Sequence, residues 1–180
     1  MNEQRIIHGC IAGDKNAQKI IFEKYAALMM SVCTRYIKNM HDAEELMLSG
    51  FLQFFNRLEK FEYRGEGSVR AWLQKIMLNE CLMFLRKENN FQLAKMEDDL
   101  LQENTSAIDK LSADEIFSLI LKLPVGYRTV FNLYVIEGMS HKEIARELNI
   151  SEGTSKSQLS KARTMLQQMI LKNENYGQEG

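Results

Sequence analysis

Only one proline, Pro124, occurs in the 180 residues of this chain, and this scarcity constrains the fold more than any other feature. Proline lacks an amide hydrogen and clashes with the preceding turn, so it is excluded from helix interiors. Apolar residues also recur three or four positions apart along much of the chain, which is the spacing of one helix face. Because no useful run in the first half alternates apolar with polar residues, we expect an all-α fold.

Two helices are predicted early in the chain. The first carries an apolar stripe over residues 20–29. The second runs from about 41 to 58, with Asp42 as its N-cap and Glu45 three residues later. A loop is expected at 60–67 (KFEYRGEG), because this stretch holds two glycines and mixed charges.

A long helix is predicted over 68–87. Ser68 is expected to cap it, and its apolar stripe includes Trp72, which we assign to the core. Arg86 and Lys87 complement the dipole at its C-terminal end.

The second half carries sharper helix signals. Ser112 followed by Glu115 is a capping box for a short helix. Pro124 suits the first turn of the next helix, which is predicted over 124–136 and is ended by Gly138.

A helix-turn-helix is predicted next. Ser140 and Glu143 form a second capping box, which opens a short helix. Asn149 and the residue after it make a tight turn, and Ser151 then caps a longer helix. Two helices joined by so short a turn, with a polar start to the second, are typical of this motif.

The net charge of −1 hides an uneven distribution. Residues 1–87 hold 13 Lys/Arg against 10 Asp/Glu, residues 88–111 hold 2 against 6, and residues 112–180 hold 8 of each. The middle segment has weak periodicity and an acidic cluster at 97–99. It is therefore predicted to be a linker between two small helical domains, with a solvated helix as the alternative.

Several function classes are disfavoured. No run of about 18 apolar residues predicts a membrane span, and no apolar core near the N-terminus predicts a secretory signal. Three widely spaced cysteines, Cys10, Cys33 and Cys81, are interpreted as buried reduced thiols of a cytoplasmic protein. Neither metal-ligand spacing, nor a phosphate-binding glycine loop, nor a nucleophile elbow is present. We expect no enzyme activity, no cofactor and no metal.

The first turns of the last helix hold the clearest candidate site. Residues 151–172 hold four basic residues against one acidic residue, so a positive helix lies in a neutral lobe. Small hydroxyl residues allow close approach to the DNA major groove, and Lys156, Gln158 and Lys161 can reach base edges or phosphates. An ordinary solvated amphipathic helix is the alternative.

The loop at 60–67 gives a second nucleic-acid signal. It places Phe61, Tyr63 and Arg64 among glycines, and aromatic and cationic groups on a loop can stack on unpaired bases. Phe61 is expected to anchor the loop to the core instead, and Tyr63 is left open between the two roles.

Three segments together resemble a known family. They are HDAEELMLSGFLQFFNRLEKF at 41–61, GSVRAWLQKIMLNECLMFLRK at 67–87 and LPVGYRTVFNLYVIEGMSHKEIARELNISEGTSKSQLSKAR at 123–163. In this order they resemble the extracytoplasmic-function (ECF) sigma factors, the small alternative promoter-recognition subunits of bacterial RNA polymerase. The resemblance implies an alternative sigma factor that binds core polymerase and directs promoter-specific initiation.

The resemblance also implies contact residues. The first domain would bind the β′ clamp helices of polymerase and melt the −10 element, and the second would bind the −35 element and the β flap. The residues implied for the −35 element are Thr154, Lys156, Ser157, Gln158, Ser160, Lys161 and Arg163. Those implied for the −10 element are Tyr63, Arg64, Ser68, Arg70 and Asn79. Those implied for polymerase binding are Asp42, Glu45, Phe55 and Arg57.

The chain departs from the family at several positions. Leu48 and Ser49 occupy positions where a glutamine and an acidic residue are usual, Ser155 replaces a common valine, and Gln158 replaces a frequent basic residue. Two alternatives therefore stay open: a helix-turn-helix regulator that binds DNA without polymerase, and a sigma-like decoy that binds polymerase without initiating. The family further implies an anti-sigma partner, while the lack of a long apolar run predicts no membrane insertion.

Overall fold

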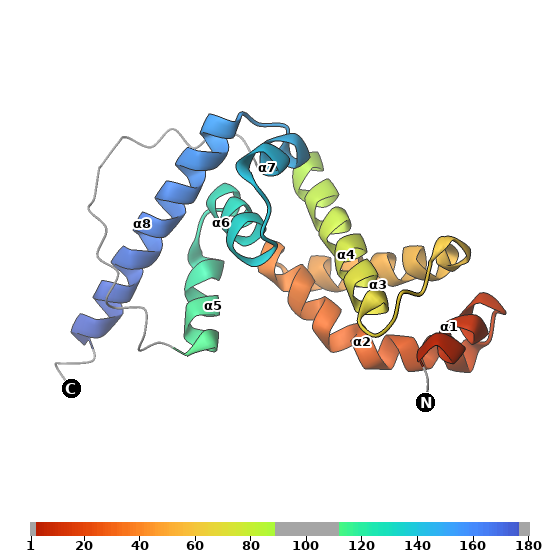
Figure 1. The fold of residues 1–180 in the computed structure, drawn as a ribbon. Coiled ribbons are helices and arrows are strands. Elements are labelled where there is room, and N and C mark those ends of the chain that lie inside the picture. The colour runs from red at the N-terminus through yellow and green to blue at the C-terminus, as the bar shows by residue number, and fades with distance from the viewer. Residues whose placement is uncertain (1–2, 89–111, 177–180) are drawn as a thin grey trace. The chain divides into compact units, whose positions relative to one another are not determined.

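The computed structural model describes residues 3–88 and 112–176, and every regular element in those ranges is a helix (Figure 1). The all-α prediction is confirmed for the described residues. Contacts divide the chain into two compact units, with the division after Phe84. The segment predicted to be a linker lies outside the described residues apart from Glu88.

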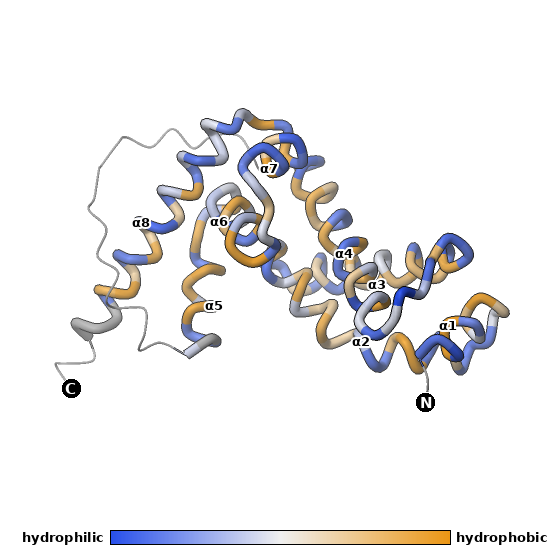
Figure 2. The backbone as a smooth tube through the Cα atoms, viewed as in Figure 1, coloured by the Kyte–Doolittle hydropathy of each residue, from blue (hydrophilic) through white to orange (hydrophobic). Residues whose placement is uncertain are grey.

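The first unit is an assembly of amphipathic helices. Blue and orange segments alternate along them in Figure 2, as expected when one face is buried. Its described elements are α1 (Glu3–Ile11), α2 (Lys15–Tyr36), α3 (Met40–Asn56), the 3-10 turn η1 (Leu58–Lys60) and α4 (Ser68–Lys87).

Two helix starts differ from the prediction. Asn39 is the N-cap of α3 in place of Asp42, because its side-chain oxygen accepts hydrogen bonds from the amides of His41 (2.9 Å) and Asp42 (3.3 Å). Ser68 is the first residue of α4 and does not cap it, since its hydroxyl donates to the carbonyl of Gly65 at 2.7 Å. Neighbouring polar residues compete for a cap, and sequence alone does not say which one wins.

An aromatic cluster joins α2, α3 and α4. The buried Phe51 lies 4.8 Å from Phe22 between ring centroids, and the buried Phe54 lies 5.1 Å from Trp72. Phe61 stacks on Trp72, with centroids 4.8 Å apart and planes inclined by 15°. The predicted anchoring of Phe61 is therefore confirmed, because its partner Trp72 packs on the core.

The three cysteines are buried and form no disulfide, as predicted. Burial raises the pKa of the Cys10 thiol to about 11. A hydrogen bond with Cys33, together with burial, raises the pKa of the Cys81 thiol far above its ordinary value. A thiol that stays protonated is a poor nucleophile, so the Cys10 and Cys81 side chains serve the core. None of the described helices is both long and apolar enough to cross a membrane.

The second unit contains the predicted helix-turn-helix. Its described elements are α5 (Ala113–Lys122), α6 (Val125–Phe131), the π-helix η3 (Asn132–Ile136), α7 (His141–Leu148) and α8 (Glu152–Tyr176). The capping box predicted at Ser112 and Glu115 is present, and Pro124 is the N-cap of α6, one position before its expected place in the first turn.

The helix predicted over 124–136 changes character partway. It is α-helical only as far as Phe131, and the next turn widens, so that the amide of Glu137 donates to the carbonyl of Asn132 at 3.0 Å. Gly138 then takes a φ of 70°, a conformation that glycine adopts without strain, and ends the helix as predicted. Apolar spacing predicted the extent of this helix, but it does not distinguish a π turn from an α turn.

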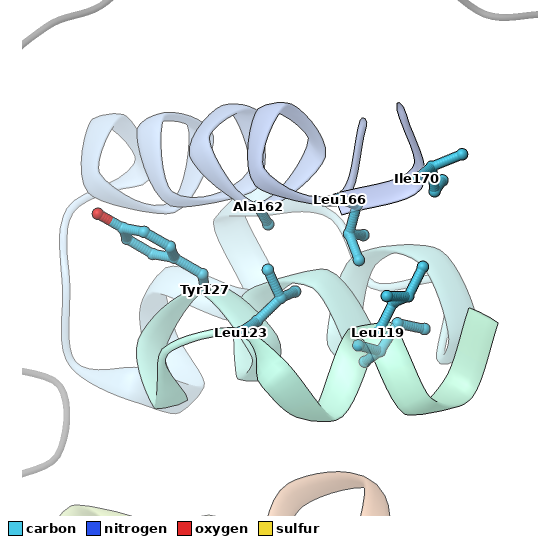
Figure 3. Close-up of a cluster of buried hydrophobic side chains, with 7 residues drawn as sticks. Leu119, Leu123, Tyr127, Ala162, Leu166 and Ile170 are labelled. Carbon is cyan, nitrogen blue, oxygen red and sulfur yellow. The ribbon is translucent and has the colours of Figure 1, made fainter. Parts of the chain in front are cut away.

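A compact apolar cluster fixes α8 against α5 and α6 (Figure 3). Truncating one such buried leucine to alanine typically costs about 2–5 kcal/mol, so this cluster sets which side of α8 faces solvent. Its buried members are Leu119, Ile120, Leu123, Tyr127, Ala162, Leu166 and Ile170.

Candidate nucleic-acid interface

Local hydrogen bonds set the geometry of the helix-turn-helix. The amide of Glu143 donates to the Ser140 hydroxyl at 3.3 Å, and the Ser140 amide donates to the Glu143 carboxylate at 2.8 Å. These hydrogen bonds hold the pKa of Glu143 below its ordinary value. Asn149 then adopts the left-handed conformation at a φ of 54°, which reverses the chain within one residue.

The start of α8 is capped as predicted. The Ser151 hydroxyl accepts a hydrogen bond from the amide of Thr154 at 2.9 Å. One turn further, Ser155 is fully buried and its hydroxyl lies 2.9 Å from Nδ1 of His141. The buried side of α8 is thereby attached to α7 as well as to the apolar cluster.

The opposite side of α8 is exposed and carries most of the predicted contacts. Lys156, Ser160 and Arg163 fall within about 60° of one another around the helix axis, given 3.6 residues per turn. Ser157 is also exposed, whereas Thr154 and Lys161 are partly buried. Four of the seven predicted −35 residues, Lys156, Ser157, Ser160 and Arg163, thus lie on or beside one surface. Thr154 is nine residues from Arg163 and projects from the other side of the helix.

Gln158, which was predicted to reach base edges or phosphates, does not join that surface. It is 3% exposed, and its Oε1 has no hydrogen-bond partner. A Cβ on Gly126 would lie 3.1 Å from that oxygen, so α6 approaches α8 closely at this point. Position 158 lies on the side of α8 that includes Ala162, which is why it is buried.

The loop before α4 borders an open pocket of about 560 Å³. Three cations surround it together with the Phe61–Trp72 stack, and Arg64 is paired with Glu62 at 2.8 Å. The pocket is lined by Lys60, Phe61, Glu62, Arg64, Ser68, Ala71, Trp72 and Lys75.

Only some of the predicted −10 residues meet at this pocket. Arg64 and Ser68 line the pocket. Tyr63, which precedes Arg64 in the chain, is partly buried and is not among the lining residues. Asn79 is exposed about three turns along α4 from Ser68, on the same side of the helix. Arg70 is also exposed, but nine residues or about two and a half turns separate it from Asn79, so it projects from the other side.

The predicted polymerase residues lie along α3 and at its end. Asp42 is partly buried in the first turn, and Glu45 is exposed, with its carboxylate 3.4 Å from Nε2 of His41. Phe55 is partly buried against the aromatic cluster, and Arg57 is exposed at the C-cap. These side chains share no single patch.

A buried carboxylate behind α3 was not foreseen. Glu80 of α4 is 6% exposed. Its carboxylate accepts a hydrogen bond from the Ser49 hydroxyl at 2.9 Å and another from the side-chain amide of Gln53 at 2.5 Å. Ser49 therefore points inward, where a donor is needed. An acidic residue at position 49 would place a second carboxylate beside the buried Glu80, so the Ser49 hydroxyl suits this contact.

The fold and the exposed face of α8 place the chain in the class of helix-turn-helix DNA-binding proteins. A family model for sigma-70 region 2 matches residues 21–91, and one for sigma-70 region 4 matches residues 113–166. Both matches lie within the residues that the structure describes, apart from residues 89–91 of the first.

Two relatives agree with the sigma-70 matches. The ECF RNA polymerase sigma-E factor of Haemophilus influenzae is 26% identical, with 94% of this chain and 96% of that protein covered. The ECF RNA polymerase sigma factor SigW of Bacillus subtilis is 28% identical, with 88% and 91% covered. The structure of CnrH in complex with the cytosolic domain of CnrY matches with a TM-score of 0.49 and 21% identity, over 93% of this chain and 96% of that chain. The chain belongs to the ECF sigma factors, alternative sigma factors that bind core RNA polymerase and promoter DNA and direct promoter recognition.

Proposed function

We propose that the exposed face of α8 is the surface that binds the −35 duplex. The observation that carries this proposal is the two-sided character of α8, whose buried side is attached to α6 and α7 while its cationic, hydroxyl-bearing side is open. Small hydroxyl groups permit close approach to the groove, and cations bind phosphates. The proposed contacts are Thr154, Lys156, Ser157, Ser160, Lys161 and Arg163.

The first domain is proposed to handle the −10 element. Cations and an aromatic stack around one open pocket suit an unstacked base and its phosphate. Arg64 and Ser68 would act at the pocket, with Tyr63 beside it and Asn79 further along α4. Arg70, on the other side of α4, would contact the DNA backbone.

The proposed partners follow from the family. Asp42, Glu45, Phe55 and Arg57 would contact the β′ clamp helices of core polymerase, and the second domain would contact the β flap. An anti-sigma factor is proposed as a regulatory partner, without a surface assigned to it. Because bacterial polymerase works in the cytoplasm, the chain is proposed to act there, as a binding protein without enzyme activity.

The proposed division of labour places domain boundaries at 1–87, 88–111 and 112–180. Once one of two tethered domains has bound its DNA element, the other is held at a high effective concentration near its own element. Each domain can therefore bind its element through few contacts. The acidic linker, with Glu97, Asp98 and Asp99 outside the described residues, is proposed to mimic nucleic acid in a basic channel of the polymerase.

Run-off transcription tests the function directly. Purified core polymerase is given a template carrying the DNA upstream of this gene, with and without the chain. A promoter-specific transcript that needs the chain is expected. Binding to core without a transcript would favour the decoy, and a footprint without polymerase that is unaffected by changes in the 60–67 loop would favour an independent regulator. Serine substitutions at Glu97, Asp98 and Asp99 that leave open-complex formation unchanged would discard the linker proposal.

A further inference from the structure

An aromatic side chain outside the proposed DNA contacts lies directly beside one of them. The guanidinium carbon of Arg163 in α8 lies 5.9 Å from the centroid of the Tyr134 ring, over the ring. This is within the range of a cation–π contact. Tyr134 belongs to the π-helix η3, so the contact joins two elements that are distant in sequence.

The Tyr134 ring is itself held in place. It stacks on the imidazole of His141, with centroids 4.6 Å apart and planes inclined by 23°. The other side of that imidazole reaches α8 again, because Nδ1 of His141 lies 2.9 Å from the buried Ser155 hydroxyl. Ser155, His141, Tyr134 and Arg163 therefore form one continuous series of contacts that begins inside the domain and ends at its exposed face.

The π turn gives Tyr134 its position. η3 widens the helix by one residue, and the chain turns at Gly138 to start α7 with His141. Such local π turns recur at functional sites, where they re-aim a side chain. Here the re-aimed side chain is a partly exposed tyrosine, flanked by the exposed Val135.

We propose that Tyr134 is a positioning residue for −35 binding: its ring, fixed on His141, holds the Arg163 guanidinium ready for a phosphate. A guanidinium stacked on a ring uses its flat face, and its N–H edge stays available to donate to phosphate oxygens. A long, exposed arginine otherwise loses side-chain freedom on binding, and the ring removes part of that loss beforehand. This inference rests on the proposed binding of DNA by α8.

The salt dependence of DNA binding separates positioning from simple loss of stability. Each phosphate contact contributes about −0.9 to the slope of log K against log salt for duplex DNA. A variant that is partly unfolded binds less at every salt concentration but keeps its slope, because the folded fraction still makes all its contacts. The measurement uses the full-length chain and a duplex carrying the DNA upstream of its own gene, from about 50 to 200 mM salt.

Tyr134→Ala is expected to make the slope shallower by about 0.9, as Arg163→Ala does, so that affinity falls about three- to fourfold less across the salt range. The double variant should match either single variant. Tyr134→Phe, which keeps the ring, should retain the original slope, and so should Val135→Ala, the matched control in the same turn.

A Tyr134→Ala variant with an unchanged slope, alongside an Arg163→Ala variant with a shallower one, would overturn the inference. If Arg163→Ala keeps the slope while Lys156→Ala makes it shallower, α8 still binds DNA and only the inference fails. If none of these variants changes the slope, the proposed −35 surface fails with it.

Discussion

The hydroxyl oxygen of Ser155 lies 2.9 Å from Nδ1 of His141, and this contact connects the two helices of the helix-turn-helix. Ser155 is fully buried in α8, while His141 is the first residue of α7. The family commonly has valine at this position, which could not supply a polar partner to the imidazole. In this chain the buried hydroxyl instead pairs with the imidazole across the two helices of the motif.

Ser155→Ala is expected to lower the free energy of unfolding of the second unit by about 0.5–1.5 kcal/mol, the usual net value of one hydrogen bond. Urea unfolding followed by circular dichroism measures it. Ser157→Ala is the matched control, because that exposed hydroxyl donates only to the Thr154 carbonyl of its own helix. A loss at Ser155 no larger than the loss at Ser157 would show that the contact does not stabilise the motif.

Ser49→Asp should destabilise the first unit by about 1–3 kcal/mol, since it removes a donor from the buried Glu80 and adds a second carboxylate beside it. Trp72 is the only tryptophan in the chain and packs in this unit, so its fluorescence in urea reports the change. Leu48→Asp is the control, because Leu48 is 48% exposed. Equal effects at the two positions would contradict a special role for the Ser49 contact.

Local signals predicted much of this fold, and contacts between distant residues account for what was missed. The capping boxes at Ser112 and Ser140 depend on residues three positions apart, so sequence alone identified them. The Ser49–Glu80 pair spans 31 residues, and no pattern within either helix announces it. Helical spacing does place Gln158 on the buried Ala162 side of α8, but the close approach of Gly126 from another helix at this point is a contact between distant residues.

Acid is expected to weaken the start of α7 through Glu143. Hydrogen bonds from Ser140 hold the pKa of Glu143 below its ordinary value of 4.5, so the charged form stabilises the fold. That stability is fully present above the unfolded pKa and is lost as pH falls through the folded one.

The free energy of unfolding of Glu143→Gln should therefore approach that of the parent chain as pH falls from about 5 to 3. Glutamine can still accept a hydrogen bond from the Ser140 amide, but it takes up no proton. Ser140→Ala, which removes the partner, should flatten the same part of the profile. The measurement is urea unfolding as a function of pH, and parallel profiles for all three chains would refute the assignment.

The burial of Gln158 yields a prediction about DNA binding that is opposite to the expectation from the sequence. Gln158→Met keeps the length of the side chain and removes the unpartnered Oε1, so the free energy of unfolding should change by less than about 1.5 kcal/mol. DNA affinity and its salt slope should stay the same, because the side chain faces Gly126.

Lys156→Ala is the matched change on the exposed face of α8. Lys156 is open to solvent and lies about one turn before the buried Leu159, which precedes the exposed Ser160. The substitution should make the salt slope shallower by about 0.9, as expected for one lost phosphate contact. Fluorescence anisotropy of a labelled duplex with each full-length variant measures both quantities. Weaker binding by Gln158→Met with unchanged stability would mean that the side chain leaves its buried position to reach DNA. The structure predicts instead that only Lys156→Ala weakens binding, since position 158 belongs to the packing of α6 against α8.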